Sequence, residues 1–306
     1  MFLRANLFLT VIWFFCFSAA TKLPDTKENS KEFSFNPSLL FNSDFYVQSN
    51  LEFTLLHELA HAVIEIHDIP VLGGQEQAAD QIAVMLLLTD KRNNGALNPV
   101  VLNKLLAISG EWMLEWKAEI KNNQTVYWGT HPLTIQRFYD VTCLAYGSNP
   151  DVLESFRKDN WLPIERAWNC DLEYIKTRKA LAWLVKKVSN SELDENWNFV
   201  NKNEPNKVFS GKVKIEWGEP SKQAHKVLAQ KLKDFSSLKY LIEQTNQVIN
   251  IKHDITIYME PYCRVPDAWW NGETNIITVC YELLELFSSN AKLVSELVNK
   301  GLSEPQ

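Results

Sequence analysis

The pattern of apolar and polar positions predicts that the first part of the chain is mainly helical. Apolar residues recur every three or four positions over residues 51–64, which is the spacing of one face of a helix. Ser49 and Glu52 match a capping box that would begin this helix, and Pro70 would end it. The same spacing predicts further helices at residues 76–89, 99–120, 132–146 and 171–188.

The pattern changes in the last third of the chain. Residues 191–206 are polar and rich in Asn, and we interpret them as a linker. Strands are predicted where apolar residues alternate with polar ones or form short runs, at 208–217, 251–259 and 275–279. Helices are predicted at 221–248 and 281–299. The expected fold class is therefore α+β, mainly helical, with a helical region at 49–190 and a small sheet within 207–306.

The N-terminus has the features of a signal peptide. Arg4 supplies a positive charge, residues 7–17 are almost wholly apolar, and residues 18–20 are small, as a cleavage site requires. We therefore predict a signal peptide at 1–20 and a polar N-terminal arm at 21–48, with export to a periplasm or out of the cell. An uncleaved N-terminal anchor is the alternative. No other segment reaches the roughly 18 apolar residues of a membrane span, so no stable span is expected after cleavage.

The charge and the cysteines narrow the picture further. The formal net charge is −6 and no basic stripe offsets it, which argues against a nucleic-acid partner. Four cysteines follow the signal, and an even number in an exported chain predicts disulfides. Pairing in sequence order joins Cys143 to Cys170 and Cys263 to Cys280, with free thiols as the alternative.

The second cysteine pair has an argument of its own. Asn271-Gly272 favours a hairpin with a two-residue type I′ turn. About such a turn Cys263 and Cys280 lie directly opposite each other, in a non-hydrogen-bonded pair, where side chains come closest. Pro266 requires that the first strand have a bulge or lie at an edge of the sheet.

His57-Glu58-x-x-His61 is the strongest chemical signal in the sequence. Residues i and i+4 share one helical face, so both histidines can bind one zinc ion. Glu58 would act as general base toward the attacking water. Glu76 begins the next predicted helix and is the candidate third ligand, and Asp80 would accept the free N–H of a ligand histidine. The alternative is two ordinary helix histidines and two acids that complement a helix dipole.

Other side chains could complete the chemistry. Attack on a carbonyl group leaves an oxyanion that needs a hydrogen-bond donor. His131, Arg137 and Tyr139, near the start of the helix predicted at 132–146, are the candidates, and each could instead be a cap or a packing residue. His67 lies roughly 240° further around the first helix than His61, so we expect it to point away from the metal.

These residues resemble a known arrangement. His57-Glu58-x-x-His61 followed by Glu76-x-x-x-Asp80 is similar to the gluzincin metallopeptidases, in which a glutamate on a second helix is the third ligand. The chain also resembles the DUF4344 family, described as metallopeptidases from this motif. The resemblance lies in HELAHAVIEIHDIPVLGGQEQAADQIA (57–83), HPLTIQRFYDVTCLAYGSNP (131–150) and ITVCYELLE (277–285).

Two positions depart from the family pattern without touching a candidate ligand. Gln75 stands where the family has Arg, and Asp267 stands where Asn would precede Ala268. The resemblance implies a zinc-dependent peptidase acting on a peptide or protein. The alternatives are a catalytically silent zincin-like protein that binds a peptide or wall polymer, and a metal-dependent hydrolase of another substrate.

The resemblance also creates an expectation about the order of elements. In zincins the edge of a small sheet lies above the active-site helix and holds the substrate. Fewer than thirty residues separate the predicted signal from this helix, too few for such a sheet. We therefore expect residues 207–306 to supply the sheet in permuted order, with the strand at 275–279 near His57.

Overall fold

The computed structural model describes residues 42–89, 99–151, 153–154, 157, 161–202 and 209–299. The predicted signal peptide and most of the predicted arm lie outside these residues. The described residues belong to one compact unit of the chain. They are mainly helical, with small sheets, as predicted for an α+β fold.

The first helix, α1 (Ser43–Ile66), begins earlier than predicted. Its N-cap is Asn42, whose side-chain oxygen accepts hydrogen bonds from the backbone N–H groups of residues 44 and 45. The end of the predicted arm is therefore helical, and the capping box at Ser49 is wrong. The Ser49 hydroxyl instead donates to the Phe45 carbonyl one turn earlier, at 2.7 Å. A polar residue inside a helix can satisfy itself in this way, which makes it resemble a cap in the sequence.

The other helices of the first part follow the prediction closely. They are α2 (Gln75–Leu88), α3 (Pro99–Asn122), α4 (Thr134–Ser148) and α7 (Cys170–Val188). The short helix α6 (Ile164–Ala167) was not predicted, because four residues are too few to show a helical period.

The predicted linker contains a hairpin instead. Strands β1 (Ser191–Leu193) and β2 (Phe199–Asn201) pair in an antiparallel two-stranded sheet. The Asp194 side chain holds the turn between them by accepting hydrogen bonds from the backbone N–H groups of Asn196 and Asn198, both at 2.8 Å. The polar composition that suggested a linker therefore serves a turn.

The described residues from 209 to 299 contain a four-stranded sheet and three helices. In chain order they are β3 (Val213–Trp217), α8 (Gln223–Asp234), α9 (Ser236–Val248), β4 (Ile255–Glu260), β5 (Ala268–Asn271), β6 (Ile276–Cys280) and α10 (Tyr281–Asn299). The single helix predicted at 221–248 is divided at Phe235, which has an extended backbone. The strand order is β3-β4-β6-β5, with β3, β4 and β6 parallel and β5 antiparallel at one edge.

The predicted two-residue turn between β5 and β6 is wrong. Asn271 lies opposite Ile276, so residues 272–275 form the turn. The Asn271 side-chain oxygen accepts hydrogen bonds from the backbone N–H groups of Glu273 and Thr274, and Asn275 has a positive φ of 56°. This side-chain bridge closes a longer turn than Asn-Gly alone favours. Cys263 and Cys280 still form a disulfide, although Cys280 pairs with Asp267 rather than with Cys263 across the ladder.

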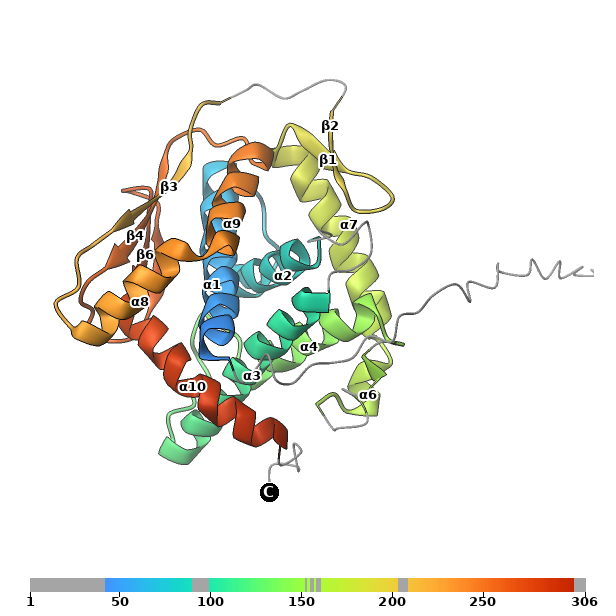
Figure 1. Ribbon diagram of the computed structural model, residues 1–306. Helices are drawn as coiled ribbons and strands as arrows, with labels where there is room; N and C mark the ends of the chain where they lie inside the picture. The colour runs from blue at the N-terminus through green and yellow to red at the C-terminus, as the bar shows by residue number, and fades with distance from the viewer. Residues whose placement is uncertain are drawn as a thin grey trace, which may run out of the picture. The chain divides into compact units, whose positions relative to one another are not determined.

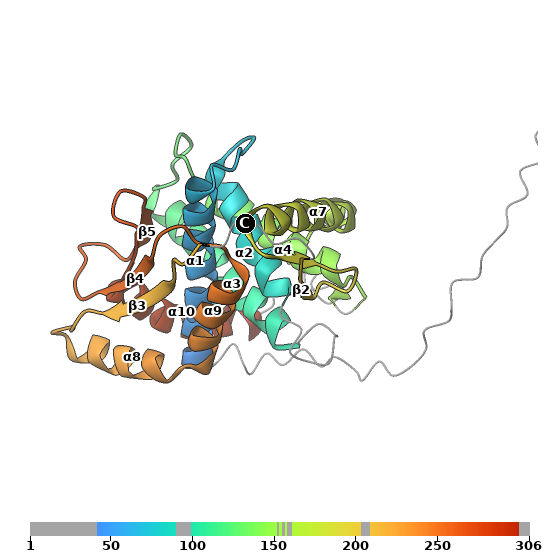
Figure 2. The ribbon, with the colours of Figure 1, turned by 90° about the horizontal axis from the view of Figure 1, so that it is seen from above.

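Helix α1 lies between the sheet and the group α2, α4 and α7, and both ribbon views show this order (Figures 1 and 2). It packs on α2, α3, α9, α10 and β5, so its residues are buried on every side over most of its length. Its buried Glu52 pairs with the buried Lys104 of α3. A buried acid requires such a partner because an unpaired charge is costly away from water.

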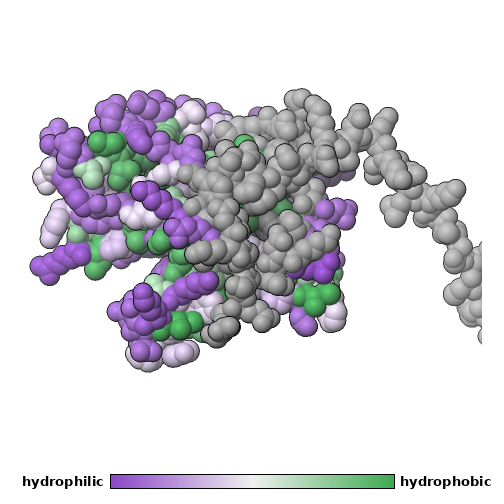
Figure 3. All heavy atoms as spheres, turned by 60° about the horizontal axis from the view of Figure 1, so that its bottom comes forward, coloured by the Kyte–Doolittle hydropathy of each residue, from purple (hydrophilic) through white to green (hydrophobic). Residues whose placement is uncertain are grey.

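Among the described residues, no helix is long and apolar enough to cross a membrane. On the face drawn in Figure 3, the described side chains are mostly hydrophilic, and apolar ones form small separate groups.

Candidate metal centre

The side chains of His57, His61 and Glu76 converge on one point between α1 and α2. The His57 Nε2 and His61 Nε2 atoms are 3.1 Å apart. The Glu76 Oε2 atom lies 3.2 Å from His57 Nε2 and 3.3 Å from His61 Nε2. All three side chains are largely buried, with 7%, 13% and 19% exposed. They form a compact set of donor atoms that could hold a metal ion.

The chain path between the two helices creates this convergence. His57 and His61 are one turn apart on α1, so their rings share a face. The chain reverses through residues 67–74, where Gly73 adopts a φ of 103° that other residues rarely adopt. Helix α2 then begins at Gln75, and Glu76 in its first turn faces the histidines. His67, at the end of α1, is not among the converging residues, as expected.

Asp80 fixes the orientation of the first histidine. Its Oδ1 atom lies 2.8 Å from His57 Nδ1, which leaves Nε2 facing the donor set. Burial lowers the pKa of His57, but hydrogen bonds to Asp80 and Glu76 outweigh it and raise the pKa to about 9. Burial would raise the pKa of Asp80. The positive charge of Arg137 and the hydrogen bonds from His57 and Arg137 outweigh this effect, so the pKa of Asp80 is lowered.

Arg137 of α4 supports Asp80 rather than standing free as an oxyanion donor. Its Nε and Nη2 atoms donate to the two Asp80 carboxylate oxygens at 2.7 and 2.6 Å. Its guanidinium lies over the Trp112 ring, 3.6 Å from the centroid. A bidentate, stacked arginine is strongly fixed, so the contacts run from Trp112 through Arg137 and Asp80 to His57.

Glu58 lies beside the donor set and beneath the edge of the sheet. The residue is buried, with 7% exposed, and its carboxylate accepts a hydrogen bond from the backbone N–H of Trp270 in β5. Burial raises the pKa of Glu58, and the nearby histidines and the Trp270 bond oppose that rise only in part. A carboxylate with a raised pKa is suited to accept a proton.

His131 also reaches the centre, from the segment between α3 and α4. Its Nε2 atom lies 3.0 Å from Glu76 Oε2, and its side chain is 57% exposed. The hydrogen bond from His131, followed by those from His57 and His61, holds the pKa of Glu76 well below its usual range. Of the three predicted oxyanion donors, His131 is the one that the structure brings to the donor set.

Tyr139 lies on the other side of α4. It is two residues after Arg137, about 200° around the helix. Its ring packs against the buried cluster of Cys143, Leu162, Ala167 and Cys170, and meets Phe138 edge to face at a centroid distance of 5.0 Å. We therefore leave Tyr139 out of the candidate site.

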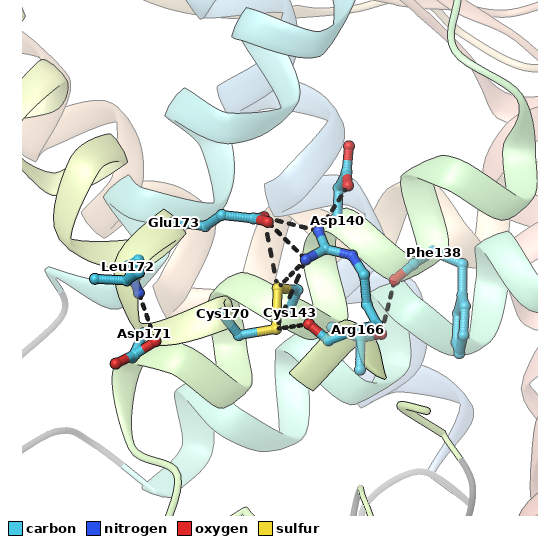
Figure 4. Close-up of a disulfide and its surroundings, with 9 residues drawn as sticks. Phe138, Asp140, Cys143, Arg166, Cys170, Asp171, Leu172 and Glu173 are labelled. Atoms are coloured by element: carbon cyan, nitrogen blue, oxygen red, sulfur yellow. Dashed lines mark hydrogen bonds and ion pairs between the residues drawn. A yellow bond between two sulfur atoms is a disulfide. The ribbon is translucent and has the colours of Figure 1, made fainter. Parts of the chain in front are cut away.

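The disulfide between Cys143 and Cys170 joins α4 to α7 behind the site, and the predicted pairing is present. Arg166 lies over it and donates to both carboxylate oxygens of Glu173 at 2.7 Å and to Asp140 at 3.1 Å (Figure 4). Asp140 also accepts a hydrogen bond from Gln77, the neighbour of Glu76 in α2. This network fixes α4, which carries Arg137, against α2, which carries Asp80.

A cleft of about 680 Å³ opens beside the centre. It is lined by α1, α3, α10, the segment before α4, and residues 266–268, and it includes His57, Glu58 and His131. Three acids one turn apart on α3, Glu111, Glu115 and Glu119, line it as well. Glu111 is bonded to the Tyr46 hydroxyl and the Asn290 amide, and burial raises its pKa to about 7.

Sequence reasoning missed Trp112 and Trp270 as site residues. Trp112 contacts Arg137 rather than the donor set, and Trp270 acts on Glu58 through its backbone. Neither contact produces a recognisable motif in the sequence. The adjacent Asn271-Gly272 was the available signal for Trp270, since it marks the end of an edge strand next to the site.

The fold and site together define a mainly helical α+β protein with a candidate His-His-Glu metal centre on two adjacent helices. A family model described as “Putative metallopeptidase” (DUF4344) matches residues 16–185 and 217–299. The chain belongs to this family. No curated protein and no solved structure matches the chain.

Proposed function

We propose that the protein is a zinc-dependent peptidase of the gluzincin type. The observation that carries the proposal is the spacing of the donor atoms of His57, His61 and Glu76, which is 3.1 to 3.3 Å. A tetrahedral zinc ion with bonds of roughly 2.0–2.1 Å places its ligand atoms roughly 3.3–3.4 Å apart. Two imidazoles and a carboxylate form the ligand set of many catalytic zinc sites, with a fourth position left for water or substrate.

Glu58 is the proposed general base. Zinc in such a site polarises a carbonyl oxygen and lowers the pKa of water. Glu58 is next to a proposed ligand, points to the same cleft and has a raised pKa, all of which suit it to take a proton from the attacking water.

His131 and β5 would act on the substrate. His131 is half exposed in the cleft and would donate a hydrogen bond to the oxyanion. Just before β5, the Asp267 carbonyl accepts a hydrogen bond from the Cys280 N–H of β6, so the backbone groups of Ala268 and Trp270 face the edge of β5 away from β6. An extended peptide could pair with the groups that remain there, as in other β-augmentation complexes.

Export remains part of the proposal. The two disulfides suit an oxidising compartment, a periplasm or the extracellular space. The partner we propose is a peptide or protein substrate, and neither nucleic acid nor a stable membrane span enters the proposal.

The proposal is tested by metal analysis followed by cleavage of a mixed peptide library. We expect one zinc per chain, cleavage that stops when a chelator removes the metal, and recovery when zinc is returned. Zinc bound without cleavage, but with peptide or wall-polymer binding, would favour the catalytically silent alternative. Zinc-dependent hydrolysis of esters or other non-peptide substrates alone would favour the other hydrolase.

The roles of Glu76 and Asp80 can be separated by zinc affinity. Replacing Asp80 with Ala removes no proposed ligand, but it removes the partner of His57 Nδ1 and of Arg137. Loss of such a partner behind a ligand costs roughly 10- to 100-fold in affinity. Replacing Glu76 with Ala removes a ligand atom and should cost more than that. Competition titration against a chelator measures both. If Asp80→Ala loses zinc more completely than Glu76→Ala, the ligand assignment is reversed.

A further inference from the structure

We propose that Trp270 is a positioning residue that sets the general base through two separate contacts. Its indole N–H, bonded to Glu65, holds the edge strand β5 on α1, so that its backbone N–H stays on the carboxylate of Glu58. The inference rests on the proposed function, because it assigns a task to Glu58. It adds Trp270, Glu65 and Gly272 to the residues on which that task depends.

Both contacts start from one residue and end on one helix. The indole Nε1 of Trp270 donates to Glu65 Oε2 at 2.6 Å. The backbone N–H of the same residue lies on the edge of β5 away from β6, where the strand packs on α1, and it acts on the Glu58 carboxylate by opposing the rise of its pKa. Glu58 and Glu65 are seven residues apart, which is about two helical turns, so both carboxylates lie on the face of α1 that meets β5. His61 lies between them on the same helix.

The turn after β5 approaches Glu65 very closely. A Cβ atom at Gly272 would overlap the Glu65 carboxylate. A side chain at this position would therefore displace the Glu65 carboxylate from its present position. The Glu65 side chain is therefore contacted twice, by the indole of Trp270 in β5 and by Gly272 in the turn that follows.

β5 needs such an anchor because its own pairing is weak. The strand has four residues, lies at the edge of the sheet, and is hydrogen-bonded to β6 on one side. The Cys263–Cys280 disulfide restrains the chain before the strand, but not the turn after it. The Glu65 contact fixes the other end. Short edge strands otherwise open easily, and a shift of about 1 Å at a catalytic group can cost roughly 100-fold in rate.

Amide hydrogen exchange on the zinc-loaded full chain tests the anchor without relying on activity. Glu65 is exposed, so its replacement should leave the fold intact. We expect Glu65→Ala to speed exchange at the residue 270 amide at least tenfold, while amides of β4 stay protected. Glu65→Gln keeps an oxygen that can accept the indole N–H and should restore protection. Unchanged exchange at residue 270 in Glu65→Ala would overturn the inference.

Activity supplies the second readout. Trp270→Phe and Glu65→Ala should each lower kcat about tenfold with zinc affinity unchanged, and the double variant should lose no more than either single one. Trp269→Phe is the matched control, because Trp269 points to the opposite face of the strand and is 42% exposed. Additive losses, or equal losses in Trp269→Phe, contradict the proposal. If the wild type cleaves nothing, the proposed function fails, and hydrogen exchange still decides whether Trp270 anchors β5.

Discussion

Replacing Glu58 with Gln is expected to lower kcat by about 100- to 10,000-fold, the range attributed to general acid–base catalysis. The amide has the size of the carboxylate and can still accept the Trp270 N–H, but it cannot take a proton at neutral pH. His57, His61 and Glu76 are untouched, so zinc content should not change. Steady-state cleavage of a peptide identified from the library, together with metal analysis, measures both quantities.

Glu65→Gln provides the matched control for this change. It makes the same substitution on the same helix, two turns later, where we expect an acceptor oxygen to be sufficient. Glu58→Gln should therefore be nearly inactive and Glu65→Gln nearly normal. A Glu58→Gln variant that keeps more than a tenth of the wild-type kcat would show that another group takes the proton.

Replacing Lys104 with Ala should destabilise the protein by about 3–5 kcal/mol, the cost of leaving one charge of a buried pair alone. Lys104 and Glu52 are both 4% exposed, and Lys104 donates to Glu52 between α3 and α1. Without the ammonium, Glu52 keeps only a 3.4 Å hydrogen bond from Gln48. Equilibrium denaturation followed by circular dichroism measures the difference in the free energy of unfolding.

Two controls show whether the cost comes from burial of the pair. Lys121→Ala changes an exposed lysine of the same helix and should stay within about 0.5 kcal/mol of wild type. Replacing both partners, as Glu52→Leu with Lys104→Met, leaves no buried charge and should recover most of the stability. If Lys104→Ala is as mild as Lys121→Ala, the pair is not buried in solution.

The proposed ligands could be predicted from sequence because they depend on local geometry. His57 and His61 share a helical face whatever surrounds the helix, and a short turn places Glu76 on the adjacent helix. The disulfides were predicted from the number and order of the cysteines. The Cys263–Cys280 pair is correct, but the hairpin register from which it was also predicted is wrong. The Asn271 side chain closes a longer turn than the predicted two-residue one.

The rest depended on contacts between distant segments. Arg137 reads as a free cation in sequence, and only the packing of α4 on α2 commits it to Asp80. Helix α1 was predicted as one-sided and too short, because its buried polar residues resemble a cap and a solvent face. The expected sheet beside α1 is built from the last third of the chain: β5 lies along α1, and β6, close to the strand predicted at 275–279, also contacts this helix.

The proposed anchoring of Glu58 by Trp270 has a consequence for the order of events during synthesis. The two residues are separated by more than two hundred positions, so a growing chain carries its complete set of proposed ligands long before the strand that orients the base exists. Contacts between such distant segments form late, because closing a long loop must precede them. If Glu58 is the general base as proposed, its orientation is set only after residue 270 has been made, so peptidase activity would be delayed until late in folding.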